Sequence, residues 1–258
     1  MKTRKINRIQ GYQLLASVGK RVLRPGGREL TEKLISGLSI NPQDQVIEFA
    51  PGKGWTAEKA LTYRPKIYKG IELSEEAALQ LRKKLGGENR EIIIGNASKV
   101  PLPDQSADKL YGEALLTMHA NQRKIKIMRE AHRLLKKGGL YGVHELSLFP
   151  QDISDTRKSA IQKTLATTMH VNARPLTLPE WIKLFEQEGF KVKNYFTNPM
   201  AVLETRRIVA DEGILQSLKI GFNIYTNPAA RKRITAIRKV FKKYKEEMTA
   251  IVIIAEKQ

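Results

Sequence analysis

The chain has 258 residues, long enough for one large domain or for a core with a smaller cap, and its 41% hydrophobic content is enough for a buried core. It contains no cysteine, which excludes disulfides, thiolate metal sites and any mechanism with a cysteine nucleophile, and we expect no bound metal. The formal net charge of +20 favours anionic partners such as nucleic acid, a phosphorylated or carboxylated substrate or an acidic lipid surface, although a solvated basic surface would give the same number.

The basic charge is concentrated in two segments. Residues 1–28 hold eight Lys and Arg and no acid, and residues 199–245 hold eleven Lys and Arg against three acids. Together they carry +16 of the +20, so the rest of the chain is nearly balanced. No apolar run approaches the ~20 residues that span a bilayer. The basic N-terminus is not followed by an apolar signal region, so we predict no stable membrane insertion and a cytoplasmic location.

The predicted elements begin with an amphipathic helix around residues 12–22. A break at 25–27 follows, and residues 28–38 predict a helix with leucines on one stripe. The next stretch, residues 46–56, reads V-I-E-F-A-P-G-K-G-W-T. It predicts a buried strand, a glycine turn and a helix start, the arrangement with which α/β proteins hold a nucleotide-like cofactor.

The turn excludes some nucleotide sites and leaves others open. The P-loop pattern is absent, whereas a dinucleotide fingerprint would have the tolerable Ala57 at its third glycine position. Gly52 and Gly54 allow the backbone to approach a ligand closely. Glu48 would repel a pyrophosphate but suits a cofactor with a cationic amino group. S-adenosylmethionine has such a group, a sulfonium and no phosphate.

Two further strands support a nucleoside cofactor. Residues 67–71 predict a strand that ends in Glu72, whose carboxylate can accept hydrogen bonds from both ribose hydroxyls of either NAD or S-adenosylmethionine. Residues 91–95 predict the third strand, which leads to Asn96 and Ala97, where an amide can meet the adenine edge.

Four motifs in this order carry a family resemblance: E-F-A-P-G-K-G, G-I-E-L-S, G-N-A-S-K-V-P-L-P-D-Q-S-A-D-K-L-Y and L-L-K-K-G-G-L-Y. Over roughly residues 45–145 the chain resembles the class I S-adenosylmethionine-dependent methyltransferases, in particular the small-molecule "type 11" group. The first glycine of the family motif is here Ala50. The resemblance implies these cofactor-binding residues: Glu48, Ala50, Gly52, Gly54, Glu72, Leu73, Asn96, Ala97 and Glu113.

The resemblance also implies the fold. We expect an α/β, Rossmann-like, seven-stranded and mostly parallel sheet with helices on both faces. The last strand, residues 248–255, should run antiparallel. The expected organisation is a single methyltransferase domain over 1–258, with these parts: a basic N-terminal helix (1–28), a core (29–198) with a lid insertion at about 149–174, a basic helical insertion (199–247) and the last strand (248–258).

The segments outside the core, which are the lid segments and the basic insertion, can each be interpreted in two ways. In the family, a leading helix and an insertion after the fifth strand often form a substrate lid, which makes Tyr12, His170 and Arg174 lid candidates. For Tyr12, a surface helix docked by Leu14, Leu15 and Val18 is the favoured alternative. Residues 199–247 predict two helices broken at 226–228. The helix at 229–245 has one apolar face and one basic face. It either packs on the core or on a second subunit, or binds nucleic acid, lipid headgroups or an acidic partner.

The chemistry follows from the cofactor, because methyl transfer from a sulfonium is an in-line displacement that needs alignment and a dry pocket. A hydroxyl or protonated nitrogen acceptor also needs a base. The candidates are His119 and His144, then His170, with Glu145 as an orienting partner, while a structural role remains open for each.

The sequence therefore predicts methyl transfer to an O, N, S or C atom of a small molecule, and the charge of the chain would suit an anionic one. It leaves open an RNA methyltransferase, although residues 116–119 lack the Asn/Asp-Pro-Pro-aromatic tetrad typical of exocyclic-amine methylation. It also leaves open a non-catalytic nucleoside-binding protein and, less favoured because of Glu48, a nicotinamide oxidoreductase.

Overall fold

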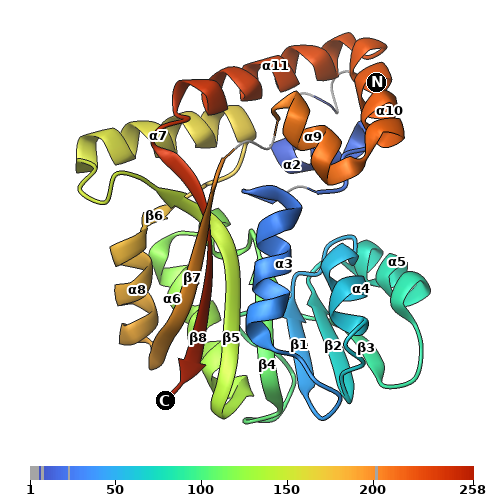
Figure 1. Ribbon diagram of the computed structural model, residues 1–258, viewed down its shortest axis with the longest axis vertical. Helices are drawn as coiled ribbons and strands as arrows, with labels where there is room; N and C mark the ends of the chain where they lie inside the picture. The colour runs from blue at the N-terminus through green and yellow to red at the C-terminus, as the bar shows by residue number, and fades with distance from the viewer. Residues whose placement is uncertain (1–5, 7–8, 23, 201–202) are drawn as a thin grey trace.

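The computed structural model describes residues 6, 9–22, 24–200 and 203–258, and a mixed sheet forms its centre (Figure 1). The sheet has eight strands in the order β3-β2-β1-β4-β5-β8-β7, with the two-residue β6 paired to β5 off this path. The strands are β1 (Gln45–Phe49), β2 (Ile67–Glu72), β3 (Arg90–Ile94), β4 (Ala107–Glu113), β5 (Leu135–Leu148), β6 (Leu176–Thr177), β7 (Phe190–Pro199) and β8 (Met248–Lys257).

The strand directions confirm the predicted fold class. Strands β3, β2, β1, β4 and β5 pair in parallel, and β8 runs antiparallel between β5 and β7. The seven long strands agree in number with the seven-stranded sheet that the sequence predicts, and β6 is an additional short strand. Because the parallel strands end at one edge, the turns that follow them share that edge, which is where an open α/β sheet binds ligands.

Helices cover both faces of the sheet, and a third group forms a cap beyond the edge where the parallel strands end (Figure 1). One face carries α3 (Gly27–Leu38), α4 (Trp55–Leu61) and α5 (Glu75–Leu85), and the other carries α6 (Asn121–Leu134) and α8 (Leu178–Gln187). The cap consists of α2 (Gly11–Ser17), α7 (Asp155–Met169), α9 (Thr205–Glu212), α10 (Ile214–Tyr225) and α11 (Pro228–Lys243). A single 3₁₀ turn, η1 (Leu116–Met118), follows β4.

Apolar side chains divide into three clusters that match these layers. Leu34 of α3 and Leu81 of α5 belong to the cluster on one face of the sheet, and Trp181 of α8 belongs to the cluster on the other. The cap has its own cluster, in which Leu15 of α2 and Ile237 of α11 are buried. The apolar face of α11 therefore packs inward, as one of the two readings predicts. In the part of the chain that the structure describes, no helix is both long and apolar enough to cross a bilayer.

The cap differs from the predicted elements in two places. The insertion contains three helices rather than two, because Gly213, with a φ of 80°, separates α9 from α10. The N-terminal helix ends at Ser17 rather than near residue 22, and Gly19, with a φ of 101°, turns the chain away. The two differences share a cause, since the Glu212 carboxylate at the end of α9 accepts the backbone N–H groups of Arg21 and Val22 at 2.7 and 2.8 Å.

Gly26 offers a test of how tightly the chain enters α3. Its φ is 67°, and a Cβ at this position would lie 2.6 Å from Leu30 Cδ1 and 2.7 Å from the Cβ of Ala250. We expect Gly26→Ala to lower the free energy of unfolding by about 2–4 kcal/mol, from left-handed strain and overpacking. Urea unfolding would measure the loss. Gly221→Ala is the control, since nothing lies within 4 Å of its added Cβ. That variant should be stabilised by about 0.5–1 kcal/mol, and equal stability of the two variants would contradict the packing described.

Candidate functional site

The turn between β1 and α4 leaves its backbone open to a ligand. Gly52 has a φ of 58°, and a Cβ built on it would meet nothing nearer than the Ala50 carbonyl at 3.9 Å. Gly54 has a φ of 74°, but its Cβ would lie 2.9 Å from Leu81 Cδ2. Gly54 is therefore needed for packing against α5, whereas Gly52 leaves a free surface at the sheet edge.

Ala50 stands where the family motif has its first glycine, and it adopts the conformation that a glycine would favour. Its φ is 52°, in the left-handed region, and its N–H donates to the Ile71 carbonyl at 2.9 Å. A non-glycine residue held in this region costs roughly 1–2 kcal/mol. The turn thus keeps its shape despite the alanine, at a small cost in stability.

Glu72 joins this turn to the end of β2. One carboxylate oxygen accepts the Gly52 N–H at 3.3 Å, and the other accepts the Ser74 N–H at 3.0 Å. Tyr12 of the cap lies close enough that the charge of Glu72, after burial of the phenol, helps to raise the pKa of Tyr12. The predicted ribose carboxylate therefore lies at the glycine turn, within electrostatic range of the predicted lid residue.

Three further residues predicted to bind the cofactor, Leu73, Asn96 and Ala97, lie just after the ends of β2 and β3. Leu73 is 70% exposed, which is high for a leucine next to a buried carboxylate. The Asn96 side-chain oxygen accepts from Arg123 at 2.6 Å and from the Ser98 N–H at 3.1 Å. The group of Asn96 that can meet a ligand is therefore its amide nitrogen, a donor, and the neighbouring Ala97 is buried.

Glu48 lies below the turn and faces two tyrosines. One of its oxygens accepts the hydroxyls of Tyr68 at 2.5 Å and Tyr111 at 2.8 Å. Burial raises the pKa of Glu48 to about 7, although both hydroxyls act in the opposite direction. At neutral pH this carboxyl is therefore only partly ionised, which weakens the attraction to a cationic group that the sequence suggested.

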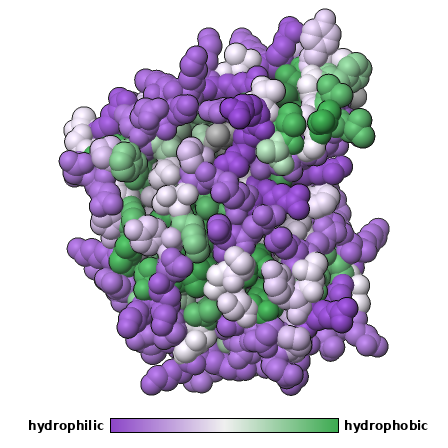
Figure 2. Space-filling model, in the orientation of Figure 1, coloured by the Kyte–Doolittle hydropathy of each residue, from purple (hydrophilic) through white to green (hydrophobic). Residues whose placement is uncertain are grey.

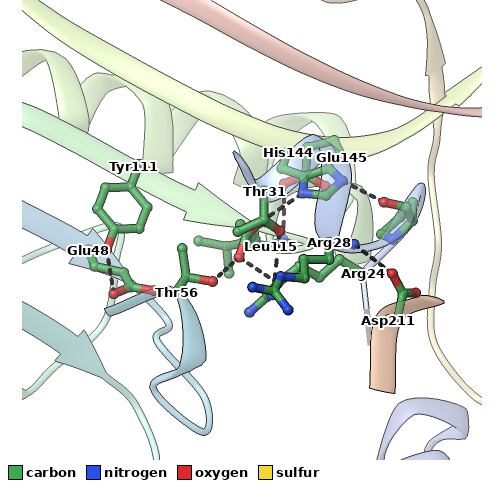
Figure 3. A network of polar contacts seen from close by, with 12 residues as sticks. Arg24, Arg28, Thr31, Glu48, Thr56, Tyr111, Leu115, His144, Glu145 and Asp211 are labelled. Atoms are coloured by element: carbon green, nitrogen blue, oxygen red, sulfur yellow. Dashed lines mark hydrogen bonds and ion pairs between the residues drawn. The ribbon is translucent and has the colours of Figure 1, made fainter. Parts of the chain in front are cut away.

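Glu113, at the end of β4, is the centre of a polar network, and its side chain is only 8% exposed. Figure 3 labels four of its partners, Arg24, Thr31, Thr56 and His144. One carboxylate oxygen accepts from Thr31 of α3 at 2.7 Å and contacts His144 of β5 at 2.8 Å. The other contacts Thr56 of α4 and Arg24. Burial alone would raise the pKa of Glu113, but Arg24 and the hydrogen bonds from His144 and Thr56 overcome it and lower the pKa to about 2. Both oxygens already have protein partners, so Glu113 lies in a structural network rather than on the open face of the turn.

His144 and Glu145 point to opposite faces of the sheet, as neighbours on a strand do. The ring of His144 is fully buried between the carboxylate of Glu113 and the carbonyl of Pro25. Both ring nitrogens already have protein partners, so neither is free to contact a substrate. Glu145 accepts the N–H groups of Leu115, Leu116 and Thr117 at 3.0, 2.7 and 2.9 Å, so it holds the turn after β4 rather than orienting a histidine. Figure 3 labels Glu145 and Leu115 of this turn.

The other predicted site residues lie in different surroundings. His119 follows η1 and is half-buried, and its pKa is lowered by burial and by the charges of Arg123 and Lys124. Its imidazole is therefore neutral at physiological pH and able to accept a proton. His170 is exposed at the end of α7, with its Nδ1 3.4 Å from Arg233. Arg174 donates its backbone N–H to the Thr117 carbonyl at 2.7 Å, which ties the lid segment to the turn after β4.

A mostly apolar pocket lies between the cap and the sheet edge. Helices α2, α7 and α11 supply its cap side, and the ends of β4 and β5 supply its floor. Its lining includes Tyr12, Leu15, Leu165, Met169, Val171, Ala173, Phe241, Ala114, Thr117, Met118 and Glu145. Tyr12 thus contributes to the pocket as the lid prediction expects, whereas His119, His144 and His170 do not. Within the described residues, no group of three or more His, Asp or Glu side chains is arranged to hold a metal ion.

Sequence reasoning missed most of the Glu113 network. Arg24, Thr31 and Thr56 lie far from Glu113 along the chain, and none of them is part of the four family motifs. Thr31 interrupts the leucine stripe of α3 with a polar residue at a buried position, which is the one signal that could have indicated a buried partner.

The comparisons with known proteins agree with this geometry. The family described as "Methyltransferase domain" matches residues 47–143. An uncharacterized protein of Haemophilus influenzae (strain ATCC 51907 / DSM 11121 / KW20 / Rd) is 31% identical over 214 residues, which are 81% of this chain and 83% of that protein. O-methyltransferase 12 of Dictyostelium discoideum is 25% identical over 175 residues, 66% of this chain but only 45% of that protein.

Among solved structures, geranyl diphosphate methyltransferase in complex with S-adenosylmethionine superposes with a TM-score of 0.65 at 13% identity. The match covers 89% of this chain and 85% of that one, and at this identity it shows the fold alone. Taken with the family match and the glycine turn, these findings identify the protein: it belongs to the class I S-adenosylmethionine-dependent methyltransferases. Its cofactor is S-adenosylmethionine.

The Glu113 network predicts a specific pH dependence of stability. The pKa of Glu113 in the folded protein, about 2, lies below the ordinary value of 4.5, so the ionised group stabilises the fold. This contribution, on the order of 3 kcal/mol, is complete above about pH 5 and is lost as the pH falls from 4.5 towards 2. We expect Glu113→Gln to lower the free energy of unfolding by about that amount at pH 7 and by about half of it at pH 3.

Urea unfolding at both pH values checks the effect. Glu58→Gln is the matched control, because Glu58 pairs with Lys84 at 2.7 Å on the surface. An exposed pair contributes at most about 1 kcal/mol. If Glu113→Gln lowered the free energy of unfolding by the same amount at pH 7 and pH 3, the charge of the carboxylate would not be what stabilises the network.

Proposed function

We propose that this methyltransferase transfers the methyl group of S-adenosylmethionine to a small, apolar acceptor that binds in the pocket beneath the cap. The observation that carries the proposal is the lining of that pocket, where aliphatic, methionine and aromatic side chains from α2, α7 and α11 meet the floor near Ala114. The cofactor supplies an already activated methyl group on a sulfonium. The protein then has to align the acceptor and exclude water.

The residues at the sheet edge support a place for the cofactor. Gly52 leaves its backbone open, and the carboxylate of Glu72 lies at the end of β2, where it would accept from the ribose hydroxyls. The exposed side chain of Leu73 offers an apolar surface to the adenine, and the amide of Asn96 offers a donor to its edge. Tyr12, close to Glu72, would cover the cofactor from the cap side.

The acceptor atom would need a base only if it carries a proton to be lost. We assign that role to His119, because its imidazole is neutral and half-buried, while His144 is enclosed by its partners and His170 faces outward. A matched relative is named an O-methyltransferase, and one structural neighbour is named for geranyl diphosphate, an acceptor with an apolar chain. The second name supports an acceptor with an apolar part, whereas the first supports only an oxygen as the acceptor atom. The predicted cytoplasmic location remains part of this proposal.

RNA methylation is the second candidate, and the observation that favours it is the basic outer surface of α11. Its exposed residues include Arg231, Lys232, Arg238, Lys239, Lys242 and Lys243. Such a surface would hold phosphates, and the binding would weaken steeply with salt. A pocket lined by methionine, leucine and phenylalanine suits an apolar acceptor better than it suits a base that needs hydrogen-bonding partners, so we rank this candidate second.

Removal of the Glu72 carboxylate tests the cofactor site. We expect Glu72→Ala to weaken S-adenosylmethionine binding about 10- to 100-fold, because two charge-assisted hydrogen bonds to the ribose would be lost. Calorimetric titration measures this, with Glu75→Ala, an exposed neighbour in the first turn of α5, as the control. Thermal unfolding of the variant shows that the turn at Gly52 is intact. Unchanged affinity in a folded variant would show that Glu72 does not bind the cofactor. Tighter binding of NAD than of S-adenosylmethionine would show that this chain does not use the cofactor of its family.

The pocket is tested by labelled methyl transfer. Wild-type protein with methyl-labelled S-adenosylmethionine and a cell extract should place label in the organic-solvent fraction. We expect Met169→Gln, which puts an amide into the pocket wall, to lower this incorporation at least about tenfold, since an unpaired amide facing an apolar ligand costs about 1–3 kcal/mol. Its affinity for the cofactor should change less than about twofold, because Met169 lines the acceptor side of the pocket.

Thr167→Gln, at an exposed position on the same helix, is the matched control and should retain full incorporation. Label that enters the RNA fraction instead would favour the second candidate. If the cofactor binds and no fraction is labelled, a non-catalytic nucleoside-binding role would replace the proposal.

A further inference from the structure

Helix α10 presents its apolar side chains to the outside of the cap. Figure 2 shows apolar residues gathered at the upper right of the molecule, where Figure 1 places α10. Five large side chains of this helix are each between 66% and 85% exposed: Ile214, Leu215, Leu218, Phe222 and Tyr225. At 100° per residue they lie on one stripe along the helix, which we call the α10 stripe. A continuous exposed stripe of this kind marks an interaction surface, whereas scattered apolar residues do not.

The opposite side of α10 explains why the stripe faces outward. Gln216 donates to the carbonyl of Gly19 at 2.6 Å, and Asn223 donates to the carbonyl of Val18 at 3.0 Å. Ile220 is the buried apolar residue that the helix contributes to the cap cluster. The helix is therefore fixed to the N-terminal segment through its polar face, and the α10 stripe is left available to a partner.

The charge around the stripe indicates which partner fits. Between Gly213 and Lys243 the sequence has eight Lys and Arg and no acidic residue. Lys219 borders the stripe on α10 itself, and α11, which packs against α10, carries exposed Lys and Arg along its outer surface. A surface that combines an apolar helical stripe with surrounding positive charge has the chemistry of an interfacial helix on anionic lipid.

We propose that the α10 stripe docks the protein on an anionic lipid surface. The stripe enters the boundary between headgroups and acyl chains, while the neighbouring lysines and arginines contact the headgroup phosphates. A second copy of the chain fits less well, because two molecules of charge +20 would bring equal basic surfaces together. Nucleic acid would match the charge but gives no partner for aliphatic side chains such as Leu215 and Leu218.

Docking in this way would bring the pocket close to the lipid. The stripe and the pocket belong to the same cap, since α10 holds the segment after α2 and packs on α11, and both α2 and α11 line the pocket. The protein would then meet an apolar acceptor where such molecules concentrate. The docking surface itself does not depend on the acceptor proposed above, because it rests on the α10 stripe and on the basic charge of α10 and α11.

Vesicle binding of the full chain tests the proposal. Phe222→Trp, a conservative change in the stripe, provides a fluorescent probe whose emission should shift to shorter wavelength on vesicles. We expect it to bind vesicles of phosphatidylcholine with about 30% phosphatidylglycerol at least about tenfold more tightly than pure phosphatidylcholine vesicles. In a sedimentation assay, the triple change Leu215→Gln, Leu218→Gln and Phe222→Gln should weaken wild-type binding to the anionic vesicles by at least about tenfold.

Leu79→Gln, at a half-exposed position on α5 outside the cap, is the matched control and should bind the vesicles as wild type does. Calorimetry with S-adenosylmethionine shows that the triple variant retains its fold, since the stripe does not touch the cofactor edge. Failure of wild type to bind anionic vesicles, or equal binding by the triple variant, would overturn the proposal. It would also be overturned if wild type were a dimer in sedimentation velocity and the triple variant a monomer, because a second copy would then cover the stripe.

Discussion

The buried carboxylate of Glu113 holds the sheet, two helices and the N-terminal segment in one arrangement. An ionised carboxylate without partners would cost several kcal/mol at such a depth, so it can be buried only when its hydrogen-bonding capacity is filled. Thr31 and Thr56 fill part of it from α3 and α4, and Arg24 and His144 fill the rest. The segment that leads into α3 therefore supplies the positive charge of Arg24 that Glu113 needs, in addition to its packing contacts.

The same network determines where the cap begins. His144 contacts both Glu113 and the carbonyl of Pro25, which fixes the chain just before α3. The backbone of residues 18–22, which precede this point, is bound by α9 and α10 through Glu212, Gln216 and Asn223. The floor of the pocket beneath the cap thus comes from the sheet, and its roof comes from distant parts of the chain. The contacts of the Glu113 carboxylate help to fix the two relative to each other.

Features that depend on nearby residues could be predicted from the sequence. The strand, glycine turn and helix start at residues 46–56 occur as expected, and so does Glu72 at the end of β2. At Ala50, where the family motif has a glycine, the backbone adopts the left-handed conformation that a glycine would favour. The spacing of apolar residues in α11 likewise predicted correctly which face of this helix is buried.

Features that depend on distant residues could not be predicted. Glu113 and Thr31 are 82 residues apart, and His144 and Pro25 are 119 residues apart. A histidine at the top of a strand looks like a general base until the acceptors on both sides of its ring are known. In the same way, the sequence did not reveal the break at Gly213, because that glycine matters only when Glu212 binds the segment after α2.

In helix α10, the need to satisfy backbone carbonyls with hydrogen bonds determines which face of the helix is buried, and the apolar face is left exposed. Its periodicity groups Leu218, Phe222 and Tyr225 on one face, and the usual expectation would turn that face inward. The carbonyls of Val18 and Gly19 instead need donors, because α2 has ended there and the segment leaves the helix at Gly19. Gln216 and Asn223 supply those donors only if the apolar face points outward. In an uncharged protein such a face would promote self-association, whereas a net charge of +20 opposes it. The basic charge and the exposed apolar stripe are therefore compatible with each other, and together they select an anionic, apolar partner.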